Sequence, residues 1–253
     1  MKLAHSHLLS AENTLMSRPT TWNGVRGIVF DAVGTLIEPV PSVAEAYTAA
    51  ARRQGVVLDP REVRARFHVH FQNDGVHAQR GLLSTDEDTE RRRWRMIVTG
   101  VLPEVAEPDR AFDELWDHFS QPMSWRCFSD VAVALDALIE QGISVCVGSN
   151  FDGRLRGVVN GLAELRGRAG SLVISSEVGY RKPHPSFFRA ACAHLGLPPE
   201  AVLCVGDDLE NDVRGAIRAG LSGLLLERGV HKPDSLPHVP NLTALIRSKF
   251  GES

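Results

Sequence analysis

The sequence predicts an α/β fold: an open parallel sheet with helices on both faces and a helical domain inserted after the first strand. Three apolar runs, each ending in a polar cluster, predict strands at 25–31, 143–150 and 201–208. They are continuously apolar rather than alternating, which is typical of strands covered on both faces. Helical patterns separate the runs, and this alternation favours right-handed crossovers within one Rossmann-like sheet.

The helices of the core are predicted from apolar spacing and from end signals. The segment 130–142 begins at Asp130, a candidate N-cap, and closes with Gly142. The segments 185–197 and 210–221 show the same helical spacing. We expect these helices to cover the faces of the sheet.

The stretch 42–126 differs from the rest of the chain because it lacks strand-like runs. It carries helical patterns instead, such as 42–55 and 110–120. Because it begins shortly after the first strand, we expect a helical cap that covers the strand ends. The remaining chain is assigned to an N-terminal tail, residues 1–24, and to the α/β core, residues 25–41 and 127–250.

The composition is ordinary for a globular enzyme, with 43% hydrophobic and 23% charged residues. The formal net charge is −3, which does not favour a nucleic-acid partner. No apolar stretch approaches the ~20 residues that a membrane-spanning helix needs, so no membrane partner is expected. The arginine-rich run 90–96 is interpreted as the solvated face of a helix rather than a substrate-facing patch.

The cysteines and the N-terminal segment bear on the cellular compartment. The four cysteines show no metal-ligand spacing, and Cys146 and Cys204 lie inside apolar runs. Reduced thiols and a cytoplasmic location are therefore expected. The N-terminal segment lacks a sustained apolar region, which favours a loose tail over a signal peptide. The sequence does not set the oligomeric state, for which a monomer is slightly favoured.

Polar side chains gather where the predicted strands end, and open α/β sheets bind ligands at that edge. Each residue alone is common in loops, but their order and placement together are hard to attribute to chance. In chain order the set is Asp31, Thr35, Ser149, Asn150, Lys182, Asp207, Asp208 and Asp212.

This set resembles the four motifs of the haloacid dehalogenase (HAD) superfamily, in the same order. The resemblance covers the chain from about 25 to 226, and VGDDLENDVRGAIRAGL, residues 205–221, is its most specific part. The helical insertion matches the cap that the superfamily carries between its first and second motifs. The resemblance implies a hydrolase, with a phosphatase of small metabolites favoured.

The residue types suit phosphoryl transfer. The carboxylate of Asp31 can attack an electrophile and form an acyl intermediate. Together with Asp207 and Asp212 it offers the oxygen ligands that Mg²⁺ prefers, with Asp212 bound directly or through water. The resemblance adds the backbone carbonyl of Val33 as a further ligand. Mg²⁺ is therefore the expected cofactor.

The resemblance also implies the roles of the remaining residues. Lys182 is the fixed positive charge beside the nucleophile, and Ser149 donates to the oxygens of the transferring group. Asn150 is a further donor to the phosphate. Thr35 is expected to hydrogen-bond and orient Asp31.

Three other polar residues are expected near the site in supporting roles. Asp208 is expected to support the metal site rather than to bind the metal directly. Asp152 is expected to cap the helix that follows it. Glu177 is expected either to pair with Lys182 or Arg181 or to hydrogen-bond within its loop.

Val33 stands where typical HAD phosphatases carry a second aspartate, which protonates the leaving group. An alkyl side chain cannot exchange a proton, and such acid–base catalysis is worth roughly 10²–10⁴-fold. A phosphatase lacking it is expected to be slow or to use good leaving groups, unless the cap supplies a proton from His68, His70 or His77.

Two alternatives to the phosphatase remain open. The 2-haloacid dehalogenases also lack the second aspartate, because halide leaves without a proton. They use no metal, however, so the acidic cluster GDDLEND, residues 206–212, argues against this alternative. The other is a catalytically weak binding or regulatory module, which would have no evident use for a nucleophile facing a metal site.

Overall fold

The computed structural model describes residues 22–79, 83–229 and 238–250. Most of the expected tail, 1–24, lies outside the described residues. The described chain forms a six-stranded parallel sheet in the order β5-β4-β1-β6-β7-β8. Its strands are β1 (Gly27–Phe30), β4 (Ser144–Ser149), β5 (Ser171–Ile174), β6 (Val202–Gly206), β7 (Ser222–Leu226) and β8 (His238–Val239).

The three strands predicted from the sequence are the neighbours β4, β1 and β6 at the centre of this sheet. Alternate residues of β1 enter different cores: Ile28 and Phe30 join one cluster of buried side chains, and Val29 joins another. Because both faces are buried, every position of the strand is apolar. The register aligns Phe30 with Val147 and Val205, so the three strands end side by side.

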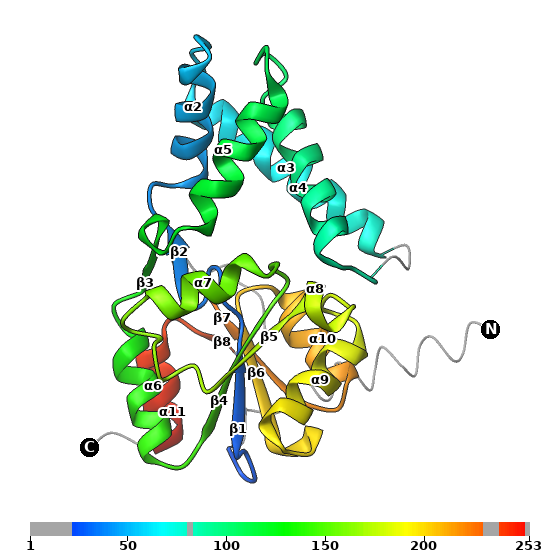
Figure 1. The fold of residues 1–253 in the computed structure, drawn as a ribbon. Helices are drawn as coiled ribbons and strands as arrows, with labels where there is room; N and C mark the ends of the chain where they lie inside the picture. The colour runs from blue at the N-terminus through cyan, green and yellow to red at the C-terminus, as the bar shows by residue number, and fades with distance from the viewer. Residues whose placement is uncertain (1–21, 80–82, 230–237, 251–253) are drawn as a thin grey trace, which may run out of the picture.

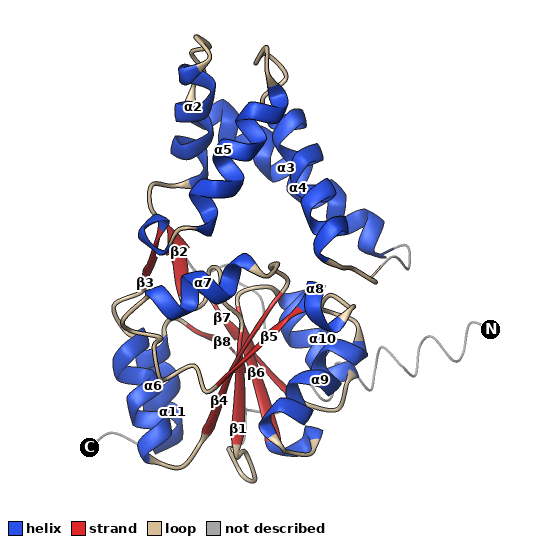
Figure 2. Ribbon diagram, in the orientation of Figure 1, coloured by secondary structure: helices blue, strands red, loops and turns tan. Residues whose placement is uncertain are grey.

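Helices cover both faces of the sheet, as Figures 1 and 2 show. One face carries α6 (Val131–Glu140) and α11 (Leu242–Phe250), and the other carries α9 (Pro185–Leu195) and α10 (Gly215–Arg218). Shorter elements follow the strand ends: α7 (Arg154–Gly161), α8 (Ser175–Val178) and the π-helix η3 (Leu209–Arg214). The 3₁₀ turn η2 (Pro199–Ala201) leads into β6. The predicted helix 210–221 is thus a π-helical turn followed by one short α-helical turn.

The segment between β1 and β4 is largely helical, in agreement with the sequence. It contains α2 (Val43–Arg53), α3 (Pro60–Gln79), α4 (Glu87–Val101) and α5 (Pro108–Ser120), and we call these four helices the helical insertion. Their buried side chains form a core of their own. The chain enters and leaves it through the antiparallel pair β2 (Ile37–Pro39) and β3 (Trp125–Cys127), the latter preceded by the 3₁₀ turn η1 (Pro122–Ser124).

The helical insertion lies beyond the carboxyl edge of the sheet (Figure 1). At the start of α2, Ser42 and Glu45 form a capping box, which satisfies backbone donors where the chain turns upward. The exact boundaries expected for the cap, 42–126, stay a prediction. Within the described parts of the chain, no helix is both long enough and apolar enough to cross a bilayer.

Candidate active site

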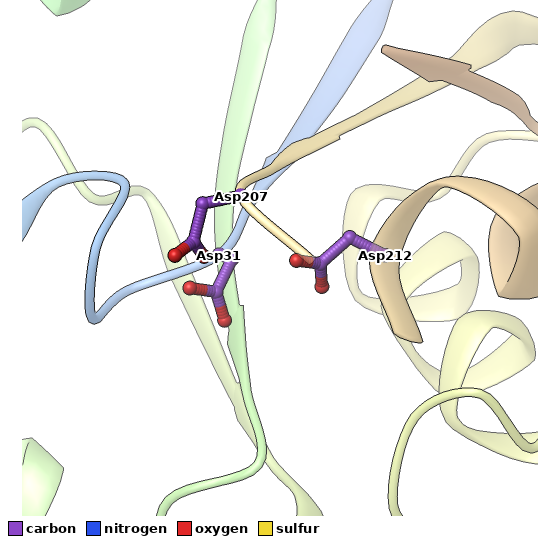
Figure 3. Close-up of side chains that lie close together, drawn as sticks. All are labelled: Asp31, Asp207 and Asp212. Carbon is purple, nitrogen blue, oxygen red and sulfur yellow. The ribbon is translucent and has the colours of Figure 1, made fainter. Parts of the chain in front are cut away.

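Three carboxylates converge at the carboxyl edge of the sheet. Asp31 directly follows β1, Asp207 directly follows β6, and Asp212 lies in the π-helix after β6. One oxygen from each lies within 4.8 Å of the others, and Figure 3 shows the three groups pointing toward one another. The sequence analysis grouped these residues because adjacent parallel strands end together.

Two glycines make this close approach possible. Gly34 has a φ of +89°, and a Cβ at this position would lie 2.3 Å from Asp207 Oδ2. A Cβ at Gly206 would lie 2.1 Å from Asp212 Oδ2. Any side chain at either position would therefore collide with a carboxylate of the cluster.

Lys182 supplies the positive charge of the cluster. Its Nζ donates to Asp31 Oδ1 at 2.6 Å, to Asp212 Oδ1 at 2.6 Å and to the backbone oxygen of Gly148 at 2.9 Å. These three bonds use all the donors of an ammonium group. Burial alone would lower the pKa of Lys182, but the carboxylates of Asp212 and Asp31 outweigh it, so the pKa is raised and the charge is kept.

Asn150 holds the backbone that carries Lys182. Its Nδ2 donates to the Lys182 carbonyl at 3.0 Å, and its Oδ1 accepts from the Lys182 N–H at 2.7 Å. This pair of bonds ties the end of β4 to the lysine loop. The expected contact of Asn150 with phosphate stays a prediction, since both polar atoms of its side chain already serve the lysine.

The loop after β6 arranges its aspartates differently. Asp208 Oδ1 accepts from the N–H groups of Glu210 and Asn211, both at 2.9 Å, so it caps the π-helix as a support behind the cluster. Asp212 Oδ2 accepts from the Asp208 N–H at 3.1 Å. Asp207 as a residue is exposed, yet the protein around its carboxyl group removes part of its water, and this effect, followed by the nearby charges of Asp31 and Asp212, raises its pKa. Burial likewise raises the pKa of Asp212, against the opposing effect of Lys182.

The donor set fits a divalent cation such as Mg²⁺. The ion prefers oxygen ligands at about 2.0–2.1 Å, so opposite ligands of one ion lie ~4.2 Å apart. The 4.8 Å limit of this cluster is close to that span and needs only a small side-chain adjustment. When all three carboxyl groups are ionised, one ammonium group leaves two negative charges unbalanced, which one divalent ion would offset.

Thr35 does not take the role expected from the sequence. Its Oγ1 is buried and has no hydrogen-bond partner among the described residues, so the expected bond that orients Asp31 is not present. The Thr35 backbone oxygen instead accepts from Arg228, at 2.9 and 3.1 Å. Lys182 orients Asp31 instead, because its buried ammonium group, rather than the Thr35 hydroxyl, is the donor that contacts the Asp31 carboxylate.

A cavity of about 430 Å³ lies between the carboxylate cluster and the helical insertion. Val33 and Ser149 line it beside Asp31, and Ser149 is buried. Most other lining side chains are apolar, and many are aromatic. The aromatic lining consists of Tyr47, Phe67, Phe71, Trp94, Phe112, Trp116, Phe119, Trp125 and Phe151.

The sequence analysis missed that the run 90–96 contributes to this cavity. Arg91 and Arg95 are exposed, as expected of a solvated face, but Glu90 and Arg93 are buried, and Trp94 lines the cavity. Arg93 Nη1 lies 3.2 Å from Glu90 Oε2. The helical spacing of the run could have suggested this, because one side of a single helix turn faces inward while the other faces water.

Two arginines of the core also line the cavity. Arg154 forms a two-pronged pair with Asp152, its Nε and Nη2 donating at 2.7 Å, and its guanidinium lies 3.4 Å from the centre of the Trp116 ring. Arg181 Nε lies 3.7 Å from Glu90 Oε1. Asp152 also accepts from the Arg154 N–H at 3.2 Å, but Gly153 is the N-cap of α7, so Asp152 is not the capping residue that the sequence predicted.

Polar contacts join the helical insertion to the core on the far side of the cavity from β2 and β3. The Arg181 N–H donates to the Leu83 oxygen at 2.8 Å, and the Thr85 N–H donates to the Gly179 oxygen at 3.0 Å. Glu87 Oε1, at the start of α4, accepts from the Gly153 N–H at 2.9 Å and from Ser176 Oγ. The insertion is therefore attached to the core on both sides of the cavity.

The remaining sequence expectations concern side chains outside the cavity. His68 is exposed, and His70 packs on Gly100, with its Cε1 2.4 Å from the position of a Cβ there. Neither is among the residues that line the cavity, and the side chain of His77 lies outside the described residues. Glu177 pairs with Arg156, so the expectation of a pair with Lys182 or Arg181 is wrong.

Comparisons with known proteins show the family to which the chain belongs. A family model for haloacid dehalogenase-like hydrolases matches residues 25–220. A haloacid dehalogenase-like hydrolase domain-containing protein 3 of Mus musculus is 30% identical over 215 residues, which cover 80% of this chain and 82% of that protein. A glyceraldehyde 3-phosphate phosphatase of Methanopyrus kandleri is 44% identical over 61 residues, 24% of this chain and 26% of that protein.

Among solved structures, an L-2-haloacid dehalogenase from Xanthobacter autotrophicus with chloropropionic acid covalently bound has a TM-score of 0.69. It is 18% identical, and the match covers 90% of this chain and 100% of that chain, which shows a shared fold. The family model spans most of the sequence and includes the acidic loop after β6 and the helix α10 that follows it. The chain therefore belongs to the haloacid dehalogenase-like hydrolases.

Proposed function

We propose that the protein is a Mg²⁺-dependent phosphatase that forms an aspartyl-phosphate on Asp31 and acts on a small phosphorylated molecule. One observation supports this above all: Asp207 and Asp212 lie with Asp31 around a single point, and Lys182 contacts two of the three. A nucleophile surrounded by uncompensated carboxylates suits a reaction in which a divalent cation is also bound.

The chain's own residues would divide the work as follows. Lys182 holds Asp31 Oδ1 at 2.6 Å, which leaves Oδ2 to attack phosphorus. Ser149 is buried on the cavity wall and would donate its hydroxyl to a phosphoryl oxygen. Asp31, Asp207, Asp212 and the Val33 carbonyl would hold Mg²⁺, whose charge would neutralise the phosphoryl oxygens. Water would then hydrolyse the acyl phosphate and regenerate Asp31.

The leaving group receives little help in this arrangement. Val33 lines the cavity at the position from which a second aspartate would donate a proton. Among the residues described as lining the cavity there is no histidine. The proposed phosphatase would therefore act on esters or anhydrides whose leaving group departs as a stable anion.

A 2-haloacid dehalogenase is the second candidate, because Val33 also suits a leaving group that needs no acid. The geometry weighs against it. Without a metal, Asp207 and Asp212 would be two additional negative charges within 4.8 Å of the nucleophile and near an anionic haloacid. A catalytically weak regulatory module is the third candidate and predicts no turnover of any substrate.

A substrate screen separates the three candidates. Purified protein is assayed on aryl, acyl and alkyl phosphates and on 2-haloacids, with and without Mg²⁺. The proposal expects phosphate release that depends on Mg²⁺ and is lost in Asp31→Asn. Halide release without Mg²⁺ would overturn it in favour of the dehalogenase, and no turnover at all would favour the module.

The compartment and assembly stay proposals. Cys127, Cys146, Cys192 and Cys204 are all free thiols, which supports a cytoplasmic protein in a reducing environment. A small-molecule substrate is proposed, since the cavity beside the carboxylates has a volume of about 430 Å³. The monomer slightly favoured by the sequence stays a prediction.

A further inference from the structure

The helical insertion lines the cavity with contacting aromatic rings. Phe67 and Phe71 of α3 stack with their centroids 5.5 Å apart, and Phe71 lies 6.0 Å from Trp94 of α4. On α5, Phe112 and Trp116 lie 5.5 Å apart. All five rings line the cavity, and we call them the aromatic wall.

Packing within the protein accounts for part of the aromatic wall, because the Arg154 guanidinium lies 3.4 Å from the centre of the Trp116 ring and that of Arg93 lies 5.2 Å from Phe71 and 5.1 Å from Trp94. It does not account for the rest. Phe71 is 43% exposed although it is a large apolar side chain, and Phe67, Trp94 and Trp116 are only partly buried. The core of the helical insertion is completed by other residues, such as Tyr47 and Val101, which are almost fully buried. Apolar rings left open toward a cavity are typical of a ligand site.

The polar groups at the other end of the cavity have roles in the proposed reaction. Asp31, Ser149 and Lys182 line it at the carboxyl edge of the sheet. A phosphoryl group bound there would direct the rest of the substrate toward the insertion, and hence toward the aromatic wall. The arginines along the way already have acidic partners, Asp152 for Arg154 and Glu90 for Arg181.

We propose that the substrate is the phosphate monoester of an aromatic alcohol, whose ring lies against the aromatic wall. This inference rests on the proposed phosphatase function and names its substrate class. A polyhydroxylated alkyl group would lose its hydrogen bonds to water and find few partners on these rings. A planar ring would instead gain aromatic stacking, worth about 0.5–1.5 kcal/mol beyond its burial.

The chemistry of the first step fits the same class. Asp31 forms a bond to phosphorus as the bond from phosphorus to the aryl oxygen breaks, and the electron pair leaves with the phenolate. A phenol has a pKa of ~10, whereas an alkyl alcohol is a far weaker acid, with an acidity near that of water. The phenolate therefore departs without a proton, and Val33 does not impede it. In the second step water attacks phosphorus, releases the Asp31 carboxylate and gives its proton to phosphate or solvent.

The test compares 1-naphthyl phosphate with glycerol 3-phosphate in the presence of Mg²⁺. We expect kcat/KM to be at least ~100-fold higher for the naphthyl ester. Phe71→Ala should lower kcat/KM for the naphthyl ester by about 10-fold, the equivalent of ~1.4 kcal/mol, and change that for glycerol 3-phosphate less than about 2-fold. Phe71→Tyr keeps the ring and should preserve the preference.

Val69→Ala is the matched control. Val69 lies on the same helix, is 52% exposed and is not among the residues that line the cavity. It should leave both substrates unchanged. Equal or better turnover of glycerol 3-phosphate, unaffected by Phe71→Ala, would overturn the aromatic substrate while leaving the phosphatase intact.

Calorimetric titration with 1-naphthol gives a readout that does not require turnover. Wild-type protein and Val69→Ala should bind the alcohol, and Phe71→Ala should weaken binding by about 10-fold. If naphthol bound in this way but no phosphate ester were hydrolysed, the phosphatase function would be wrong and the aromatic site would stand. Absence of naphthol binding would overturn the aromatic site itself.

Discussion

At the scale of single residues, the candidate site is governed by charge balance around Lys182. The sequence was sufficient to predict that Asp31, Lys182 and Asp207 lie together, because Asp31 and Asp207 follow adjacent strands and Lys182 belongs to a motif of the same family. It was misleading for Thr35, whose hydroxyl has no partner in the described structure. Which donor orients a carboxylate depends on sub-ångström placement of side chains, and a motif does not encode that placement.

Val33 offers the most direct residue-scale test of the missing acid. Val33→Asp should raise the rate of alkyl phosphate turnover more than that of aryl phosphate turnover, because only the alkoxide needs protonation. The rates are read from single-turnover measurements of the first step. Val33→Asn is the matched control, since asparagine has nearly the same shape as aspartate but cannot transfer a proton.

An unchanged alkyl-to-aryl ratio in a folded, Mg²⁺-binding Val33→Asp variant would contradict this account. The apolar core against which Val33 packs would raise the pKa of the new carboxyl group, which keeps it protonated and ready to donate. The same burial would make the variant less stable, so folding is checked by thermal unfolding before the rates are compared.

The raised pKa values of Asp207 and Asp212 predict how stability depends on pH without metal. An aspartic acid whose pKa is raised by folding keeps its proton at a pH where the same group in the unfolded chain, with a pKa of ~3.9, has lost it. The free energy of unfolding of the metal-free protein should therefore fall as pH rises from ~4 toward neutrality. Thermal unfolding in a chelator measures this.

Asp207→Asn should flatten that pH dependence, because it removes one of the three mutually repelling carboxylates. Mg²⁺ should stabilise the wild-type protein more at neutral pH than at pH ~4, where protons compete for the ligands. A metal-free protein whose stability rose through this range would show that repulsion within the cluster is not the dominant effect.

At the scale of secondary structure elements, prediction worked where burial was complete. The strands β1, β4 and β6 are covered on both faces, so their sequences are apolar at nearly every position. The strands β5 and β7 were missed because each begins with partly exposed residues, and the edge strand β8 was missed because it has only two residues. The π-helix η3 was expected as a regular helix, since the apolar spacing of one turn does not distinguish the two.

The turn after β1 can be tested with two glycines of similar backbone conformation. Gly34→Ala and Gly142→Ala both place a Cβ at positive φ, +89° and +72°, and each should lower the free energy of unfolding by about 1–2 kcal/mol. Only Gly34→Ala also drives a Cβ toward Asp207 Oδ2. Nothing lies within 4 Å of the Cβ position at Gly142.

Mg²⁺ affinity and turnover should therefore fall at least about 10-fold in Gly34→Ala and stay near wild type in Gly142→Ala. The measurements are metal titration by calorimetry and chemical unfolding of both variants. Equal Mg²⁺ affinity in the two variants would mean that Asp207 moves aside without loss, and that its placement by Gly34 is not needed for the metal site.

At the scale of the whole molecule, the sequence indicated a helical insertion but not what that insertion presents to the site. The aromatic wall combines rings from α3, α4 and α5, so it arises only when three helices pack together. A helical pattern marks which residues face inward, yet it does not separate those that fill a core from those that line a cavity. Reactive residues at strand ends are thus easier to predict from the sequence than the residues between packed helices that select the substrate.

The polar contacts between the helical insertion and the core, on the side of the cavity opposite β2 and β3, are expected to hold the insertion closed over the site. Glu87 joins α4 to the core at Gly153 and Ser176, whereas for its neighbour Asp88 the described residues show no hydrogen bond to the core. Both are acids in the first turn of α4, so both contribute similarly to the helix dipole. Glu87→Gln should therefore weaken closure, and Asp88→Asn should not.

The amides of Thr85 and Arg181 report that closure directly, because each donates a hydrogen bond between the insertion and the core. In Glu87→Gln, hydrogen exchange at these two amides should accelerate about 5- to 10-fold, while amides of the central strand β1 keep their wild-type protection. KM should rise in the same variant, since substrate binding must then also close the insertion. If Asp88→Asn accelerated exchange equally, loss of negative charge at the helix start, rather than the Glu87 contact, would control the opening.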